Sequence, residues 1–395
     1  MPNKKIKLVE FVVLMALLQS LVALSIDSML PALSIIGEDL GTNNRNDNQL
    51  IISFLFLGFA LGQLIFGPIS DAIGRKKPMY IGLTIFILGS ILSMIATNYM
   101  IMLTGRVLQG FGAAAPRVLS LALVRDQYTG RQMAKILSFV MSIFILVPVL
   151  APTIGQLILY FTDWRTIFTL LLSLAILAFC WLFLRQPETL PLSKRGTISL
   201  KFFLKSFIEC FKQKTTLCYT ITSGFIFGAF MGYLNSVQQI LQIQYNLGIS
   251  FPIYFGILAL SIGASSYTNS QIVVQYGMRL ICWKALQILS LTSLIFLFFS
   301  IYHLGTPPLW SFMTWGLITF FCIGGIFSNF NTLAIEPLGH IAGTASAIIG
   351  SCTTLIALIL GASIGQLYNG TVIPLLLGFA FLGIASLITI KVINK

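Results

Sequence analysis

The stretch that decides the fold reads Gly67-Pro-Ile-Ser-Asp71-Ala-Ile-Gly74-Arg75-Lys76-Lys77. It joins two apolar runs, residues 49–70 and 79–97. A helix needs about 20 apolar residues to cross a bilayer, and each run is close to that length. The three basic residues predict a short loop on the side of the membrane where positive charge collects.

Ten similar runs extend outward from this pair. They cover residues 8–32, 101–124, 136–161, 166–183, 217–240, 252–274, 280–301, 309–334, 344–367 and 372–390. The composition agrees, because 57% of the residues are hydrophobic, 9% are charged and the mean hydropathy is +0.93. A soluble domain carries roughly 25% charged residues, which excludes a water-soluble enzyme. The runs are unbroken rather than alternating, which argues against an outer-membrane barrel. The sequence therefore predicts an all-α membrane protein with 12 transmembrane helices.

The formal net charge of +13 follows the expected topology. With twelve spans both termini lie on one side, and 20 of the 24 Lys and Arg residues fall there. The positive-inside rule makes that side cytoplasmic, so the charge requires no nucleic-acid partner. The first run is too long for a typical signal peptide and is interpreted as a retained span.

The longest polar segment divides the chain into two halves that echo each other. Residues 151–157 and 361–367 both end in Ile-Gly-Gln-Leu, at an offset of 210. Parallel repeats of this kind build transporters with a substrate site between two halves. We therefore expect two pseudo-symmetric six-helix bundles, residues 1–185 and 217–395, joined by a cytoplasmic linker, residues 186–216.

Within the linker, apolar residues recur at helical spacing while lysines point elsewhere. The apolar positions are Leu200, Phe203, Leu204, Phe207, Ile208 and Phe211. This pattern is typical of an amphipathic helix on the inner leaflet, and the alternative is a loosely ordered linker.

Motifs for covalent chemistry are missing from the sequence. The six cysteines are scattered singly and the two histidines are far apart, so no metal site is expected. No phosphate-cradling glycine-rich loop ending in Lys-Ser/Thr occurs. The sequence predicts no cofactor and no enzyme.

Several motifs resemble those of the major facilitator superfamily. Residues 67–77 are similar to its loop signature G-x-x-x-D-R-x-G-R-R/K, with Ala72 in place of the usual Arg. The run at 101–124 contains Arg106-Val-Leu-Gln109-Gly110, similar to R-x-x-Q-G. Further stretches sharpen the likeness to the Bcr/CflA group of bacterial drug:proton antiporters. They are Asp27-Ser-Met-Leu-Pro31, Val124-Arg-Asp126, Trp164-Arg165, Pro187-Glu-Thr-Leu190 and Pro337-Leu-Gly-His340.

The resemblance implies a proton-coupled exporter in the bacterial inner membrane that works by alternating access. Its partners are protons, a small molecule and the lipid bilayer, the proton gradient replaces a cofactor, and a monomer is expected. The alternative on the same fold is an importer of a siderophore or metabolite. A polytopic sensor or enzyme and a channel are alternatives of different classes.

Asp27 is the one acidic residue deep within an expected span. A buried carboxylate is costly and should pair or bind a proton. By depth, Arg106 lies at about the same level, so we expect the two to pair. The resemblance implies that Arg106 serves proton coupling, and the alternative is a static ion pair between two helices.

Arg117 lies 11 residues after Arg106, which is roughly 16 Å deeper at 1.5 Å per residue. There it could bind an anionic substrate, answer Asp27, or cap carbonyls freed by Pro116. Its counterpart in the second half is Asn329. The expected substrate-binding residues are Arg117, Asn329, Gln109, Gln239 and Asn235.

Two further sets of residues follow from the resemblance. The expected gating residues are Gly67, Asp71, Gly74, Arg75, Arg125 and Asp126, with Asp71 accepting from amides at a helix N-terminus and pairing with a basic neighbour. Arg125 and Asp126 could instead be a solvated helix end. Pro148, Pro152 and Gly155 match the antiporter motif, either as a bend or as ordinary packing.

Overall fold

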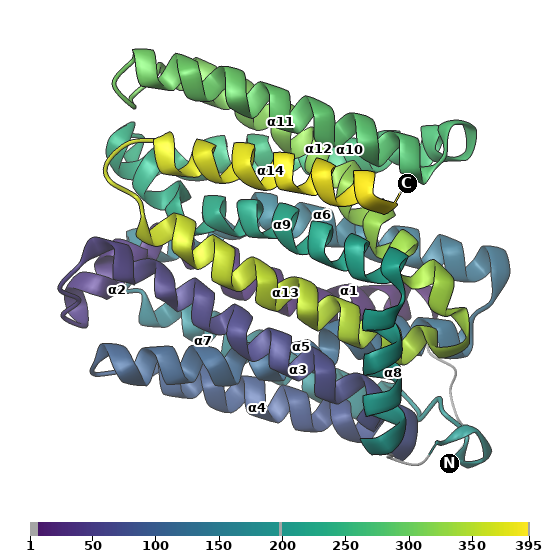
Figure 1. Ribbon diagram of the computed structural model, residues 1–395. Helices are drawn as coiled ribbons and strands as arrows, with labels where there is room; N and C mark the ends of the chain where they lie inside the picture. The colour runs from purple at the N-terminus through teal and green to yellow at the C-terminus, as the bar shows by residue number, and fades with distance from the viewer. Residues whose placement is uncertain (1–6, 197–199, 394–395) are drawn as a thin grey trace. The chain divides into compact units, whose positions relative to one another are not determined.

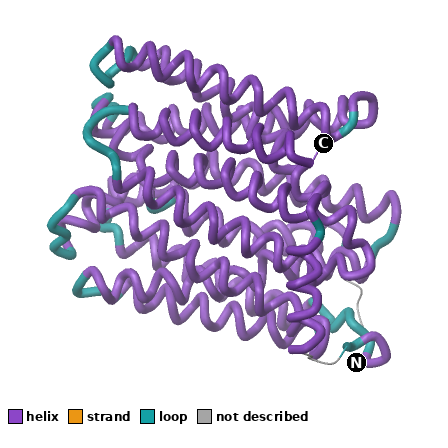
Figure 2. Tube along the Cα trace, viewed as in Figure 1, coloured by secondary structure: helices purple, strands orange, loops and turns teal. Residues whose placement is uncertain are grey.

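The computed structural model describes residues 7–196 and 200–393, and these residues form helices and loops without a strand (Figure 1, Figure 2). Lys4, Lys5, Lys395 and residues 197–199 of the predicted linker lie outside the described residues. The all-α prediction is confirmed for the part of the chain that the structure describes.

The chain forms two compact units. The first comprises Met1–Thr42 and Phe54–Phe203, and the second comprises Asn43–Ser53 and Leu204–Lys395. Helix α3 begins in the second unit and continues in the first. The predicted domain boundaries at residues 185 and 216 stay a prediction.

The first half of the chain contains seven α-helices and shorter turns. They are α1 (Leu8–Asp27), η1 (Leu30–Ala32), α2 (Leu33–Asp39), η2 (Arg45–Gln49), α3 (Leu50–Ile73), α4 (Lys76–Met94), α5 (Tyr99–Gln127), α6 (Gly130–Phe161), α7 (Arg165–Arg185) and η3 (Leu192–Lys194).

The second half of the chain also contains seven α-helices and shorter turns. They are α8 (Leu200–Lys212), α9 (Lys214–Val237), the π-helical turn η4 (Gln238–Gln244), η5 (Gly248–Ser250), α10 (Phe251–Tyr276), α11 (Met278–Tyr302), α12 (Leu309–Ile335), η6 (Glu336–Ile341), α13 (Ala342–Gln366) and α14 (Ile373–Ile393).

Eleven helical segments among the described residues are long and apolar enough to cross a membrane. The sequence predicts twelve. The difference arises because α12 and α13 run together as one segment, Leu309–Gln366, through the turn η6. Leu338 is non-helical in that turn, and α12 and α13 are each long enough to span alone.

Small residues let α4 and α5 of the first unit pack backbone against backbone. A Cβ on Gly82 would lie 2.2 Å from the Cβ of Ala115, and one on Gly89 would lie 2.4 Å from the backbone nitrogen of Gln109. Lipid supplies no hydrophobic force between helices, so close van der Waals packing holds them together.

The second unit uses glycine in the same way. Glycines at every fourth position of α9 lie on one helix face and receive branched side chains of α13. The glycines are Gly224, Gly228 and Gly232, and the side chains are Ile356, Leu360 and Ile364.

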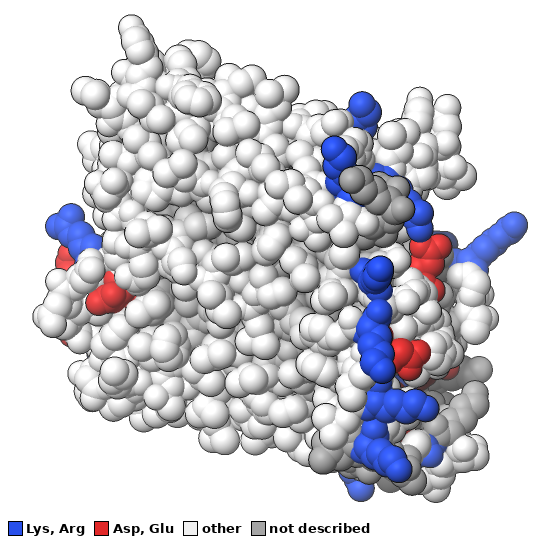
Figure 3. Space-filling model, viewed as in Figure 1, with Lys and Arg blue, Asp and Glu red and all other residues white. Residues whose placement is uncertain are grey.

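Helix α8 is amphipathic, as the pattern of its residues predicts. Ser206 and Cys210 are buried, while Leu204, Ile208 and Phe211 are 40–53% exposed. Basic side chains form a blue column at the position of α8 (Figure 1, Figure 3). The placement of this helix on the inner leaflet stays a prediction.

Candidate functional site

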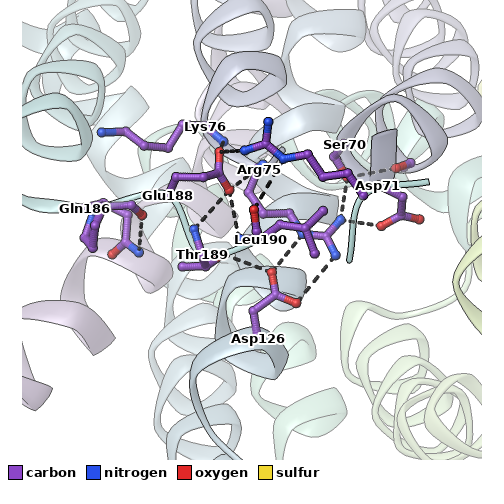
Figure 4. A network of polar contacts seen from close by, with 12 residues as sticks. Ser70, Asp71, Arg75, Lys76, Asp126, Gln186, Glu188, Thr189 and Leu190 are labelled. Carbon is purple, nitrogen blue, oxygen red and sulfur yellow. Dashed lines mark hydrogen bonds and ion pairs between the residues drawn. The ribbon is translucent and has the colours of Figure 1, made fainter. Parts of the chain in front are cut away.

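The predicted loop between α3 and α4 forms the centre of a polar cluster in the first unit (Figure 4). Helices α3, α5 and α7 run in the same direction, so their C-terminal ends meet there. We call Ser70, Asp71, Arg75, Asp126 and Glu188 the arginine cluster.

Arg75 is the hub of the arginine cluster. Its Nε donates to Asp126 Oδ2 at 2.9 Å, its Nη1 donates to Ser70 Oγ at 2.8 Å, and it pairs with Asp71 one helical turn earlier. Its side chain is 10% exposed. Burial opposes the charge, but the hydrogen bonds that Arg75 donates to Asp126 and Asp71 outweigh burial and raise the pKa of Arg75.

Glu188 caps the N-terminus of α4. Its carboxylate accepts from the backbone N–H of Arg75 at 2.9 Å and from that of Lys76 at 3.1 Å. Burial raises the pKa of this carboxyl, but the N–H groups of Leu190, Arg75, Lys76 and Thr189 outweigh burial and leave it below its ordinary value. The prediction that Asp71 accepts from these amides is wrong, because Asp71 lies at the C-terminal end of α3 and turns to Arg75.

Gly74 allows the loop to turn under Glu188. Its φ is +99°, in the region that favours glycine, and a Cβ there would lie 2.6 Å from Glu188 Oε2. Gly67 supplies the carbonyl that accepts from the Ser70 hydroxyl at 2.8 Å. Both glycines therefore contribute backbone geometry to the arginine cluster.

Arg125 lies outside this arrangement. It is exposed, and no ion pair among the described residues includes it. Its neighbour Asp126 is 17% exposed at the side chain and also accepts from Thr189 Oγ1 at 2.9 Å. Of the two expected gating residues Arg125 and Asp126, Asp126 belongs to the arginine cluster and Arg125 does not.

Asp27 and Arg106 lie near each other but are not paired. Asp27 is the last residue of α1 and is 6% exposed, and Arg106 of α5 is fully buried. Arg106 donates from Nη2 to the Ser25 carbonyl at 2.7 Å and from Nη1 to the side chain of Gln109. The expected ion pair is absent from the described residues, because both terminal nitrogens point to these neutral groups.

Gln109 was expected to bind substrate, but its side chain is fully buried. Its Oε1 accepts from Arg106, and its Nε2 donates to Ser90 Oγ at 2.9 Å. These bonds favour a role in positioning Arg106.

Arg117 reaches across to α1 and α6. Its Nη1 donates to Gln19 Oε1, and its Cζ lies 4.5 Å from the centre of the Phe144 ring. The guanidinium is part-buried and forms no ion pair with any described residue, so it does not answer Asp27 in this structure. A guanidinium has five N–H donors, so Arg117 can also donate to an anionic group while it contacts the Phe144 ring.

The three residues of the antiporter motif lie within α6, which is helical through Pro148 and Pro152. Gly155 lies against the backbone of Ser28, the residue after Asp27. A Cβ there would lie 2.1 Å from the Ser28 carbonyl oxygen and 3.2 Å from Pro31 Cγ. The missing side chain at Gly155 therefore allows α6 to pack closely against this end of α1.

In the second unit, Asn235 and Gln239 belong to a set of linked side-chain amides. Gln49 Nε2 donates to Gln239 Oε1 at 2.6 Å, and Gln239 Nε2 donates to Asn46 Oδ1 at 3.1 Å. Asn235 Nδ2 donates to Ser53 Oγ at 3.2 Å. Gln239 lies in the π-helical turn η4, a feature frequent at functional sites.

Asn46 also joins this set to the end of α13. Its Nδ2 donates to the carbonyls of Gln366 and Tyr368 at 2.9 Å each, and Gln366 Nε2 donates to the Asn46 carbonyl at 3.0 Å. We call Asn46, Gln49, Ser53, Asn235, Gln239 and Gln366 the amide cluster. It contains no charged group.

Asn329 pairs with Asn269 of α10. Each amide donates to the other, with N–O distances of 2.8 and 3.3 Å, and both residues are buried. Arg117 and its predicted counterpart thus each bond to an amide side chain of another helix in the same unit.

The site residues predicted from the sequence do not include Glu188, Gln19 and Asn269. The sequence carried a signal for Glu188, because Pro187-Glu-Thr-Leu190 follows a span on the same predicted side as the loop 71–77. It carried a weaker signal for Gln19 and Asn269, which are amides within apolar runs.

Comparison with known proteins agrees with this architecture. A model of the Major Facilitator Superfamily matches residues 15–362. The MFS-type transporter YdgK of Bacillus subtilis is 34% identical over 369 residues, covering 92% of this chain and 90% of YdgK. The bicyclomycin resistance protein homolog of Haemophilus influenzae is 29% identical, covering 93% of this chain and 91% of the relative.

The fold has a solved counterpart. The xylose transporter XylE of E. coli, in a partially occluded inward-open conformation, superposes with a TM-score of 0.76 at 12% identity, covering 98% of each chain. The bicyclomycin resistance relative is consistent with the predicted likeness to the Bcr/CflA group. The chain is a multi-pass membrane transporter rather than an enzyme, and it belongs to the major facilitator superfamily.

Proposed function

We propose that the chain is a proton-coupled antiporter that exports small molecules by alternating access. Membership of the superfamily and the bicyclomycin resistance relative support export of drug-like compounds. The observation that carries the proposal is the state of Asp27, a buried carboxylate at the end of α1 beside an arginine that bonds elsewhere.

Asp27 is the proton site in this proposal. Its carboxylate has no hydrogen bond or ion pair among the described residues, and an ionised acid without partners is costly inside a membrane. Binding a proton removes that cost. Arg106 bonds to Ser25, two residues before Asp27, so loss of the proton would draw the guanidinium from the Ser25 carbonyl to the carboxylate.

The substrate class follows from Arg117. Its guanidinium is part-buried, stacked on Phe144 and bonded to the neutral Gln19, and none of the described acids forms an ion pair with it. An anionic or carboxylated compound, such as a carboxylate siderophore, would supply the missing partner through bidentate contacts. Asn235, Gln239 and Asn329 would contribute neutral hydrogen bonds.

The topology is part of the proposal. The distribution of Lys and Arg supports a cytoplasmic position for the arginine cluster and both termini. The bacterial inner membrane and a monomeric state complete the proposal. In this orientation Arg75, Asp126 and Glu188 brace the cytoplasmic end of the first unit.

The test is proton flux in proteoliposomes that contain a trapped pH dye. Cationic, neutral and polycarboxylate compounds are added under an imposed proton gradient to the wild type, Asp27→Asn, Arg117→Ala and Arg117→Lys. Asp163→Asn is the matched control, because Asp163 is exposed and caps the next helix. We expect substrate-driven proton flux that is lost in Asp27→Asn and kept in Asp163→Asn.

Each component of the proposal has its own contrary result. Normal coupling in Asp27→Asn would place the proton site elsewhere. Proton movement in the same direction as substrate would make the chain an importer. Equal loss of all compounds in Arg117→Ala would remove Arg117 from anion selection, whereas loss of the anionic compounds alone, with partial rescue in Arg117→Lys, supports it.

A further inference from the structure

The second unit contains a groove between α10 and α11. Both helices pack on α12, which forms its floor, and they touch each other little. The groove has a volume of about 390 Å³ and is lined by residues of all three helices. It is separate from Asp27, Arg106 and Arg117, which belong to the first unit.

The groove is open along an apolar surface. Tyr276, Leu280, Ile288 and Phe321 line it and are each 42–54% exposed. Large apolar side chains left uncovered on a membrane-spanning helix face lipid. The walls therefore fit a hydrocarbon chain.

Lys284 is the one charged residue among those that line the groove. It lies six residues after the start of α11, which is ~9 Å along the helix axis. It is exposed, and no described acid forms an ion pair with it. Leu280 and Ile288, one turn before and after it, are on the same helix face and line the same groove.

The ammonium of a lysine at this depth needs an anion or water at the membrane interface to stabilise its charge. Its flexible stem can lie along apolar surface while the ammonium reaches toward the headgroups. A basic pocket between membrane helices on the cytoplasmic side is a site for acidic phospholipid headgroups.

We propose that this groove binds one anionic phospholipid, with an acyl chain between α10 and α11 and the headgroup phosphate on the Lys284 ammonium. The proposal does not rest on the identity of the transported substrate or on the direction of transport. The assignment to the cytoplasmic leaflet rests on the proposed topology. A neutral lipophilic compound would fit the apolar walls but would leave the ammonium without a partner.

Native mass spectrometry of the full chain in detergent tests the proposal. The protein is titrated with phosphatidylglycerol or with phosphatidylcholine of the same acyl chains, and the first bound lipid is counted. We expect the wild type to prefer phosphatidylglycerol by about ten-fold, or about 1.4 kcal/mol, because the choline ammonium of phosphatidylcholine neutralises the phosphate that Lys284 would bind.

Four variants separate the effect of charge from the effect of shape. Lys284→Gln removes the preference, and Lys284→Arg keeps it. Lys391→Gln is the matched control, because Lys391 is an exposed lysine in the last turn of α14 and does not line the groove. Ala285→Phe fills the groove and lowers binding of both lipids.

An unchanged preference in Lys284→Gln overturns the proposal. So does equal loss in Lys391→Gln, since the preference then reflects overall charge. If both lipids bind equally while Ala285→Phe slows transport of a lipophilic substrate, the groove is a substrate path and the lipid site is wrong. Retained binding in Lys284→Arg also shows that loss in Lys284→Gln is not misfolding.

Discussion

The Glu188 carboxylate accepts a hydrogen bond from the backbone N–H of Arg75, 113 residues earlier in the chain, at 2.9 Å. The same side chain accepts from Lys76, so one acid satisfies two amides at the start of α4. An anion at a helix N-terminus is also favoured by the helix dipole. Glu188 thus fixes the loop that holds Arg75 against Asp126.

Glu188→Gln should lower the free energy of unfolding by about 1 kcal/mol at neutral pH, because the capping group loses its charge. The pKa of Glu188 is depressed below its ordinary value of 4.5. Its contribution is therefore present above that value and is lost as the pH falls through the folded pKa. Denaturation of wild type and variant in detergent from pH 7 to pH 3 should show the difference shrinking toward acid. A constant or growing difference would mean that the carboxylate charge is not the cause.

Gly74→Ala should cost more than about 2 kcal/mol. A left-handed residue with a Cβ costs about 1 kcal/mol in backbone strain alone, and the new methyl group would displace Glu188. Gly41→Ala is the control, because Gly41 has φ +71° and no atom within 4 Å of an added Cβ. Thermal unfolding of both variants measures the contribution of the cap, and equal losses would show that strain alone matters at Gly74.

Asp126→Asn should destabilise the first unit more than Asp71→Asn. The side chain of Asp126 is 17% exposed and that of Asp71 is 50% exposed, so solvent screens the second pair more strongly. We expect about 2 kcal/mol for Asp126→Asn and less than about 1 kcal/mol for Asp71→Asn. Chemical denaturation of the two variants under identical conditions decides, and a larger loss at Asp71 would contradict the ranking.

The sequence predicted the features that depend on residues close together in the chain. Apolar runs identified the spans, and the resemblance of the loop motif anticipated that Asp71 pairs with a basic neighbour, which is Arg75. Depth along two antiparallel helices brought Arg106 near the end of α1. The predicted spans 309–334 and 344–367 correspond to α12 and α13, and the turn η6 between them contains the non-helical Leu338.

The features that failed or were missed depend on side-chain direction and distant pairing. The position of a residue along the membrane normal does not determine whether Arg106 bonds to Asp27 or to the Ser25 carbonyl, since both acceptors lie at the same end of α1. The amide cluster joins residues 190 apart, such as Gln49 and Gln239, and no local pattern marks such a pair. Neutral amides also lack the charge that makes Asp71 and Arg75 conspicuous in an apolar sequence.

Gly155→Ala should impair transport by disturbing the end of α1. The added Cβ would overlap the Ser28 carbonyl, one residue after Asp27, so α6 and α1 must separate. Overpacking of this kind costs about 1–3 kcal/mol. Gly339→Ala is the control, because an added Cβ meets nothing within 4 Å there. Proteoliposome transport at equal protein content should fall in Gly155→Ala alone, and normal transport would show that α1 tolerates the shift.

The amide cluster should contribute stability that does not depend on pH. Gln49 and Gln239 share a hydrogen bond of 2.6 Å between neutral groups, and both residues are buried. A double-mutant cycle of Gln49→Ala and Gln239→Ala should give a coupling energy of about 1 kcal/mol, the net value of one neutral hydrogen bond. The same cycle at pH 5 and pH 8 should agree, because neither side chain titrates. Zero coupling would mean that water replaces the bond without loss, and a coupling that changes with pH would require a titrating neighbour in contact with the cluster.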